Sequence, residues 1–275
     1  MKSTINVTNE VMKMTIFKQE IKTQKLAIII WSLSIGLLVA ACVLMYPDME
    51  SQMDGVNDMF SSMGDFTAAF GMDQLNFGTL IGFYAVEGGN MLGIGGAFFA
   101  AIIGITALMK EERDRTAEFL LTHPVSRVRV ISEKLLSTFA IIIILNIIVL
   151  LCSISSIKMI DEEMFWKELM LFHLAYLLMQ FEIAGICFGI SAFIKKAGIG
   201  IGIGIAGLMY LLNIVANISE DAKFLKYVTP FGYTEGSDII NNKDINMDYL
   251  IPGMIIMIIC IVIGFIKYNK KDISS

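Results

Sequence analysis

Long apolar blocks alternate with short polar segments along the whole chain. Six blocks each have roughly 20 residues, the length that a helix needs to cross a bilayer core of about 30 Å. They are residues 26–46, 85–109, 130–152, 169–194, 198–216 and 249–267. Because lipid offers no partner for backbone polar groups, such continuous apolar runs predict helices. The pattern therefore predicts an all-α polytopic membrane protein, a single domain over residues 1–275 with six transmembrane helices.

Composition supports this interpretation and excludes a soluble domain. Hydrophobic residues make up 56% of the 275 residues and charged residues 17%, with a mean hydropathy of +0.69. A soluble domain carries about 25% charged residues. The four cysteines, Cys42, Cys152, Cys187 and Cys260, all lie in apolar blocks without the spacing of a metal site or a disulfide framework. We expect membrane lipid around this chain, no nucleic acid, no metal and no cleavable signal peptide.

The basic residues alternate between the two sides of the predicted bundle. Residues 1–25, 110–134, 195–196 and 267–271 hold 16 of the 21 lysines and arginines. The opposite connections hold the other five, and residues 47–84 have no basic residue. Lysine and arginine are enriched in cytoplasmic loops. Both termini and the second-to-third connection are therefore predicted to be cytoplasmic, in a cell membrane crossed several times.

The second-to-third connection, residues 110–129, is an unusual polar segment that contains every arginine of the chain. It reads KEERDRTAEFLLTHPVSRVR. From Glu111 to Thr122 the pattern predicts a short amphipathic helix, with Ala117, Leu120 and Leu121 on one face. Pro124 disfavours a continuation of that helix through the preceding residue.

This segment and the start of the next apolar block resemble the first cytoplasmic loop of bacterial export-type ATP-binding-cassette (ABC) permeases, the ABC-2 type membrane proteins. That loop has an acidic pair, a Thr-x-Glu, a Leu-Leu, a Pro-x-Ser-Arg turn and a lysine that opens the next helix. The matching positions are Glu111, Glu112, Thr116, Glu118, Leu120, Leu121, Pro124, Ser126, Arg127 and Lys134. Arg115 stands where the family usually has glycine.

The resemblance implies that this loop is a coupling helix, which docks in a groove of a separate ATPase subunit. The residues implied in that contact are Glu111, Glu112, Arg115, Thr116, Glu118, Leu120, Leu121, Pro124 and Arg127. ATP and Mg²⁺ would bind to the ATPase and no cofactor to this chain, and a second permease copy or homologue would complete a dimer. The alternative is a surface helix on lipid headgroups, but its four carboxylates would be repelled by anionic lipid.

The N-terminal segment, residues 1–25, resembles the family's cytoplasmic elbow helix. Lys13, Lys18, Lys22 and Lys25 alternate with apolar residues at helical spacing. This pattern is typical of a basic amphipathic helix in the inner headgroup region. A disordered basic tail is the alternative.

The chain has no phosphate-binding loop of the Gly-x-x-x-x-Gly-Lys-Ser/Thr kind, so we do not expect it to hydrolyse nucleotide. The run AGIGIGIGIAG, residues 197–207, opens an apolar block. Its overlapping Gly-x-x-x-Gly pairs, at Gly198, Gly200, Gly202 and Gly204, favour close helix packing in lipid. The pattern leaves open whether that contact is within one chain or between two.

Polar residues inside the fourth block are candidates for a translocation path. Glu182 lies near mid-span, where a charge costs about 2.5–3.5 kcal/mol on insertion scales. Asn146 and Gln180 are possible hydrogen-bond partners for it. His173, Tyr176 and Gln180 form a second polar stripe. Either set can line a cavity, or can simply pack between helices.

Three functions compete. The first is the permease of an ATP-driven exporter, whose substrate we expect to be an amphipathic or hydrophobic molecule such as an antimicrobial peptide or drug. The second is an ion- or proton-coupled transporter that uses Glu182. The third, an intramembrane protease, is disfavoured because the only two histidines, His123 and His173, are expected near opposite faces. A Cu(I) site on the methionines of residues 45–72 is conceivable, but their spacing equally suits an apolar helix stripe.

Overall fold

The computed structural model describes residues 14–50, 55, 59, 63–72, 75–110, 125–194 and 198–270. Regular structure in these residues is helical throughout. The elements are α2 (Thr15–Glu50), α4 (Asp65–Ala69), α5 (Leu80–Asn90), the π-helix η1 (Met91–Gly95), α6 (Gly96–Thr106), α9 (Arg127–Met159), α10 (Trp166–Ser191), α11 (Ile199–Ile218), the 3₁₀-helix η2 (Glu220–Tyr227), α12 (Gly236–Asn242) and α13 (Met247–Lys270).

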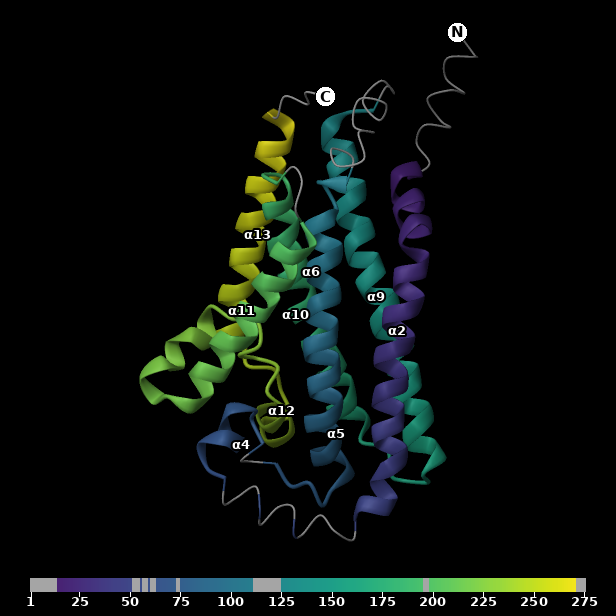
Figure 1. Cartoon of the computed structure of the whole chain (residues 1–275), viewed down its shortest axis with the longest axis vertical. Helices are drawn as coiled ribbons and strands as arrows, with labels where there is room; N and C mark the ends of the chain where they lie inside the picture. Colours follow the sequence, from purple (N-terminus) through teal and green to yellow (C-terminus); the bar gives the residue numbers. More distant parts are fainter. Residues whose placement is uncertain are drawn as a thin grey trace.

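Six helices in the described residues are long and apolar enough to cross a membrane, which confirms the all-α class and the six apolar helices. They are α2, the continuous α5–η1–α6 helix, α9, α10, α11 and α13. Figure 1 shows that α2 begins, and α13 ends, at the same end of the bundle. We call this the terminal end, and the opposite end, which carries α4 and α12, the loop end.

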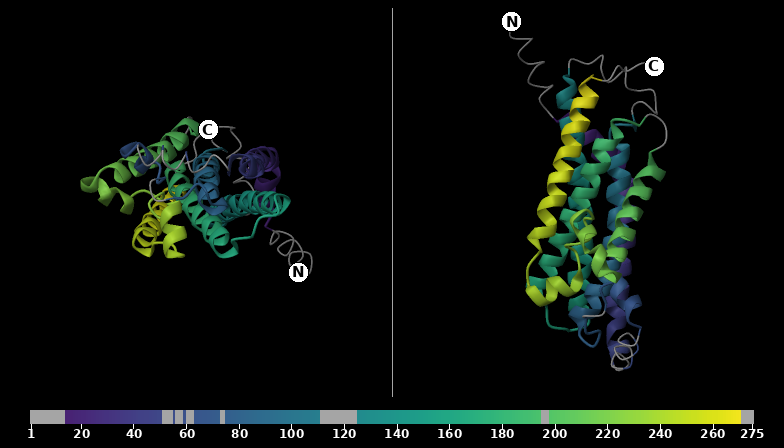
Figure 2. Two further views of the ribbon diagram at one scale, coloured as in Figure 1. Left: turned by 90° about the horizontal axis from the view of Figure 1, so that it is seen from below. Right: turned by 90° about the vertical axis from the view of Figure 1, so that its left-hand side faces the viewer.

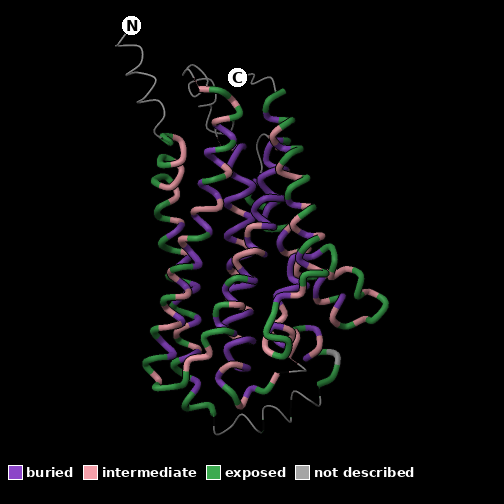
Figure 3. The backbone as a smooth tube through the Cα atoms, turned by 180° about the vertical axis from the view of Figure 1, so that it is seen from behind, coloured by how far each residue is buried: buried purple, intermediate pink, exposed green. Residues whose placement is uncertain are grey.

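The bundle is built around α5–η1–α6 and α10, whose most apolar windows are each 67% buried. The paired helices α2 and α9 flank one side of this centre, and α11 and α13 flank the other, as the view along the bundle shows (Figure 2). The most apolar windows of α11 and α13 are only 22% buried. Figure 3 shows this burial pattern along the backbone, with buried positions on the inward faces of the helices. Many of the exposed positions carry large apolar side chains, which suit contact with lipid.

The predicted elbow helix is not separate from the first span in the described residues. From Thr15 the chain forms one continuous helix of 36 residues that runs through the predicted span to Glu50. Nothing between Lys18 and Leu26 interrupts the helix, because this stretch has no proline or glycine and its lysines can extend into water. Residues 1–13 of the predicted elbow lie outside the described residues.

Glycines allow the central helices to approach closely. A Cβ on Gly104 of α6 would overlap with the Ala184 carbonyl oxygen of α10 and lie 2.9 Å from Ala184 Cα. In the glycine run, a Cβ on Gly202 of α11 would lie 2.9 Å from the Ala101 carbonyl oxygen of α6, whereas Gly200 has no atom within 4 Å of that position. One face of the run therefore packs within the chain, as small residues do in membrane bundles.

Candidate functional site

A buried ion-pair cluster joins three helices at the terminal end of the bundle. Lys134 of α9 is 1% exposed, and its Nζ donates to Glu20 Oε1 of α2 at 2.8 Å. The same Nζ donates to the carbonyl oxygen of Ala107, just after α6, also at 2.8 Å. Lys110 Nζ lies 3.8 Å from Glu20 Oε2. A buried charge is tolerated when it is paired and hydrogen-bonded, which is the case for Lys134.

The neighbouring residue Glu133 caps the start of α2. Its Oε2 accepts hydrogen bonds from the backbone N–H groups of Ile16 and Phe17, at 3.0 and 3.2 Å. The first N–H groups of a helix have no partner within the helix, and the positive end of the helix dipole favours a carboxylate there. Arg129 Nε donates to Glu133 Oε1 at 2.8 Å. Consecutive side chains of α9 therefore hold α2 at two points.

This cluster lies at both ends of the segment predicted to be the coupling loop. Lys110 is the first residue of that loop and the last one described before residue 125. Helix α9 begins at Arg127, and the Ser126 side chain caps it by accepting a hydrogen bond from the Arg129 N–H at 3.3 Å. Residues 111–124, which include every predicted coupling residue except Arg127, lie outside the described residues. Arg127 Nη1 donates to the carbonyl oxygen of Asn269 in α13 at 3.2 Å.

The polar residues predicted for a translocation path separate into three groups. Asn146 Nδ2 of α9 donates to Gln180 Oε1 of α10 at 2.7 Å and to the Ile142 carbonyl at 2.9 Å. Asn146 and Gln180 therefore pair with each other. The sequence analysis had suggested each of them as a partner of Glu182, and that prediction was wrong. Two residues of separation on a helix put Gln180 and Glu182 on different faces.

Glu182 instead pairs with Tyr233, from the segment between η2 and α12. Tyr233 O–H donates to Glu182 Oε2 at 2.9 Å, and both residues are buried. Gly253 of α13 leaves the space for this carboxyl group, because a Cβ there would overlap with both carboxylate oxygens. Glu182 Oε1 has no hydrogen-bond partner among the described residues. Sequence patterns could not find Tyr233, which is 51 positions away.

His173 belongs to a third group that the sequence analysis missed. Tyr84 O–H donates to Ser153 Oγ at 2.8 Å, and His173 Nε2 lies 3.0 Å from the same tyrosine oxygen. With the tyrosine proton directed to Ser153, the histidine donates from Nε2. His173 Nδ1 is then an acceptor, with no partner in the described part of the chain. The three residues tie α5, α9 and α10 together near the loop end.

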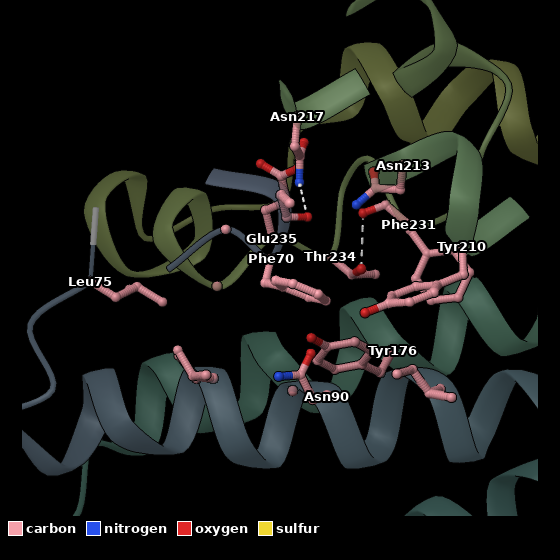
Figure 4. A pocket seen from close by; sticks show the side chains of 18 residues that line it. Phe70, Leu75, Asn90, Tyr176, Tyr210, Asn213, Asn217, Phe231, Thr234 and Glu235 are labelled. Carbon is pink, nitrogen blue, oxygen red and sulfur yellow. Dashed lines mark hydrogen bonds between the residues drawn. The ribbon is translucent and has the colours of Figure 1, made fainter. Parts of the chain in front are cut away.

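Tyr176, the middle residue of the predicted stripe, lines a cavity of about 60 Å³ near the loop end. The walls come from α5 and η1, α10, α11, residues 69–71 and the segment 231–236. Figure 4 shows the side chains of Phe70, Tyr176 and Tyr210 directed toward one another across this space. His173 and Gln180 are not among the lining residues. The structure thus does not unite the predicted stripe in one cavity.

The family of this chain is shown by comparison with models of known protein families. A family model described as ABC-2 family transporter protein matches residues 14–273. The chain belongs to the ABC-2 transporter family. No curated protein sequence matches it. Nearly the whole chain is thus an ABC-2 permease, the membrane component that works with an ABC ATPase and has no ATPase domain of its own.

In the described residues of the ABC-2 permease, the polar side chains form several groups that are separate from one another. No group of three or more histidine, cysteine, aspartate or glutamate side chains suited to a metal occurs in the described residues. These groups connect separate parts of the bundle, and the cluster around Lys134 differs from the others in adjoining the predicted coupling loop. It is therefore the strongest candidate for a functional contact between the bundle and an ATPase.

Proposed function

We propose that this chain is the membrane-spanning subunit of an ATP-driven exporter, with its terminal end in the cytoplasm and an ABC ATPase bound to residues 110–129. Family membership supports the class of transporter. The observation that carries the docking assignment is the Lys134 cluster, which connects both ends of that loop to α2. A loop attached to the spans in this way can transmit a movement of the bound ATPase to them.

The contacts around the loop suggest how its movement reaches the spans. Lys134 links α9 to α2 and to the end of α6, and Glu133 holds the start of α2. Beneath them, an apolar cluster that includes Val130, Ile131 and Phe188 joins α9 to α10. A displacement of the loop would therefore move α2, α6, α9 and α10 together. Close packing transmits such movement because it deforms little.

The proposed cargo is an amphipathic or hydrophobic molecule, for example an antimicrobial peptide or a drug. Two copies of this chain, or this chain and a homologue, would form the path and alternate its access as the ATPases close on ATP. Pockets for such cargo are mostly apolar with a few polar groups. The aromatic and amide side chains around the loop-end cavity are of this kind.

The docking proposal is tested by Leu120→Asp, with Leu120→Ile as the matched control. A carboxylate in the apolar groove of a partner would be buried without a counter-charge, which is strongly unfavourable. We expect both variants to insert in the membrane, and only Leu120→Asp to lose co-purification with the ATPase subunit. Undiminished co-purification of Leu120→Asp would refute docking at this helix.

A proton-coupled transporter is the second candidate, because Glu182 is buried and one carboxylate oxygen lacks a partner in the described residues. Its test compares Glu182→Gln with Tyr233→Phe in proteoliposomes carrying a proton gradient and no ATP. Gradient-driven uptake by the wild type and by Tyr233→Phe, but not by Glu182→Gln, would favour this candidate. For an exporter, we expect Glu182→Gln to transport with ATP at every pH tested.

A further inference from the structure

The 3₁₀-helix η2, which connects the spans α11 and α13 on the loop-end side, has faces of different chemistry. A 3₁₀-helix has three residues per turn, so positions three apart share a face. Glu220, Lys223 and Lys226 form a charged face. Phe224 and Tyr227 form a second face, and their side chains are 63% and 47% exposed. An exposed aromatic face therefore lies directly beside a charged one.

Contacts with the bundle fix the direction of these faces. η2 packs against α11 and α13, and its third face is partly buried. Lys226 Nζ donates to Glu235 Oε2 at 2.9 Å, which ties the end of η2 to the start of α12. The ring of Tyr227 meets that of Tyr249 in α13 at 4.9 Å between centroids. The exposure of Phe224 is therefore a property of the fold and not of a loose connection.

The aromatic face continues the lipid-facing surface of two spans. Val215 and Ile218, in the last turn of α11, are exposed, and so are Ile251 and Ile255 near the start of α13. Figure 1 shows the segment after α11 projecting from the flank of the bundle, and Figure 2 shows it at the edge of the molecule in the view along the bundle. η2 therefore lies where the apolar surfaces of α11 and α13 end.

This arrangement suits the headgroup region of a bilayer. Aromatic side chains, tyrosine among them, concentrate at membrane–water interfaces, where the ring contacts acyl chains and the polar atoms reach water. A helix with a charged face beside an apolar one lies in the plane of such an interface. Lys223 Nζ lies 2.6 Å from Glu220 Oε2, and both side chains are exposed, as a face turned to water requires.

Water and a second copy of this chain fit the aromatic face less well than lipid. Contact of large aromatic side chains with water is unfavourable. The core of a protein–protein interface is depleted of charged residues, whereas the exposed residues Asp221 and Lys223 adjoin Phe224. Lipid satisfies both sets of groups, because its acyl chains contact the rings while its headgroups and the water around them solvate the charges.

We propose that η2 is an interfacial anchor, with Phe224 and Tyr227 among the upper acyl chains of the leaflet at the loop end and the face of Glu220 and Lys223 in water. The partner is the lipid bilayer and not a second protein. η2 leads directly into residues 229–234, which are buried in the bundle, so an anchor here would hold that segment at a fixed depth. The proposal concerns this chain alone and does not depend on the proposed export function.

The test places one tryptophan at a time on η2 and measures its fluorescence in phosphatidylcholine nanodiscs. The background carries Trp31→Phe and Trp166→Phe, which remove both native tryptophans. Brominated phosphatidylcholine quenches a tryptophan that touches acyl chains, and iodide quenches one in water. We expect Phe224→Trp to lose most of its emission to the brominated lipid and little to iodide. Lys223→Trp, the matched control on the neighbouring face, should show the reverse.

The three-residue period of η2 supplies a second pair of variants, which keeps the test decisive if one variant does not fold. Tyr227→Trp should behave like Phe224→Trp, and Glu220→Trp like Lys223→Trp, because each pair shares a face. Bromines near the carbonyl end of the acyl chains should quench the aromatic pair more than bromines near the terminal methyl group. The opposite order would place η2 deeper than an interfacial anchor.

The other possible outcomes would also overturn the proposal. Iodide quenching at all four positions would place η2 in water. Protection of Phe224→Trp from both quenchers would show that protein covers this face, as in a contact between two copies. Equal quenching of all four by brominated lipid would show that the whole helix lies within the hydrocarbon region. Because the nanodiscs contain no ATPase and no cargo, none of these results bears on docking at residues 110–129.

Discussion

Lys134 shows how one side chain can determine the arrangement of several helices. Its amine is buried, and it donates to a side chain of α2 and to the backbone after α6. Sequence alone marks it as the lysine that opens the third span. Its partners are 114 and 27 positions away, so no local pattern could reveal the contacts. The neighbouring Glu133 has the same property, because the Ile16 N–H group that it caps is 117 positions earlier.

The first prediction concerns this lysine. Lys134→Met keeps most of the side-chain volume and removes its donors, leaving the Ala107 carbonyl and Glu20 without them. Breaking a buried charge pair by removal of one partner costs about 3–5 kcal/mol. We therefore expect the thermal midpoint of the purified chain to fall clearly in detergent. The double variant Lys134→Met with Glu20→Gln should recover part of the loss, and an unaltered midpoint in the single variant would contradict the assigned contacts.

At the residue scale, sequence reasoning identified several buried polar groups but not their partners. Asn146, Gln180, Glu182 and His173 are all buried in the structure. Helix periodicity predicts which residues of one helix share a face, and it contains no information on the rotation of that helix against another. Glu182 pairs with Tyr233, which lies in a segment outside the six spans. The partners suggested from the sequence, Asn146 and Gln180, were therefore wrong for Glu182.

At the element scale, the apolar blocks predicted the number and class of the long helices, because lipid permits few other structures. Departures from the expected elements have local causes. Helix α2 begins at Thr15, before the apolar block, because a helix satisfies its own backbone hydrogen bonds in water as well as in lipid. At the π-turn Met91–Gly95 the second span packs against α10, and Gln180 Nε2 lies 3.5 Å from the Leu92 carbonyl oxygen. Hydropathy is insensitive to such a change of pitch.

The second prediction distinguishes the glycines of two helices. Gly104→Ala on α6 forces a methyl group against the backbone of Ala184, which cannot rotate away, and overpacking of this kind costs about 1–3 kcal/mol. Gly200→Ala on α11 meets no atom within 4 Å and should gain up to about 1 kcal/mol from helix propensity. Thermal midpoints of the two purified variants should therefore move in opposite directions. Parallel shifts would exclude the close contact of α6 with α10.

For the whole molecule, the distribution of charge and the arrangement of helices are independent observations that agree. The structure brings the start of α2, the end of α13 and the described residues on both sides of the predicted coupling loop to one end. In the sequence, the segments predicted to be cytoplasmic, which adjoin these described elements, contain 16 of the 21 lysines and arginines. Nothing in helix packing requires this asymmetry, since reversal of the molecule in the membrane would preserve every internal contact. We propose that the bias reflects insertion, because basic loops stay on the cytoplasmic side.

The third prediction follows from this asymmetry and concerns the orientation on which ATPase docking depends. In a background with the four native cysteines replaced by alanine, single cysteines are introduced as Thr122→Cys in the coupling loop and Asn241→Cys in the exposed part of α12. A membrane-impermeant maleimide should label Asn241→Cys in intact cells, and Thr122→Cys only after permeabilisation. The reverse pattern would place the coupling loop outside the cell, where no cytoplasmic ATPase could bind it. Labelling of both sites in intact cells would indicate mixed insertion, in which case charge alone does not fix the orientation of this chain.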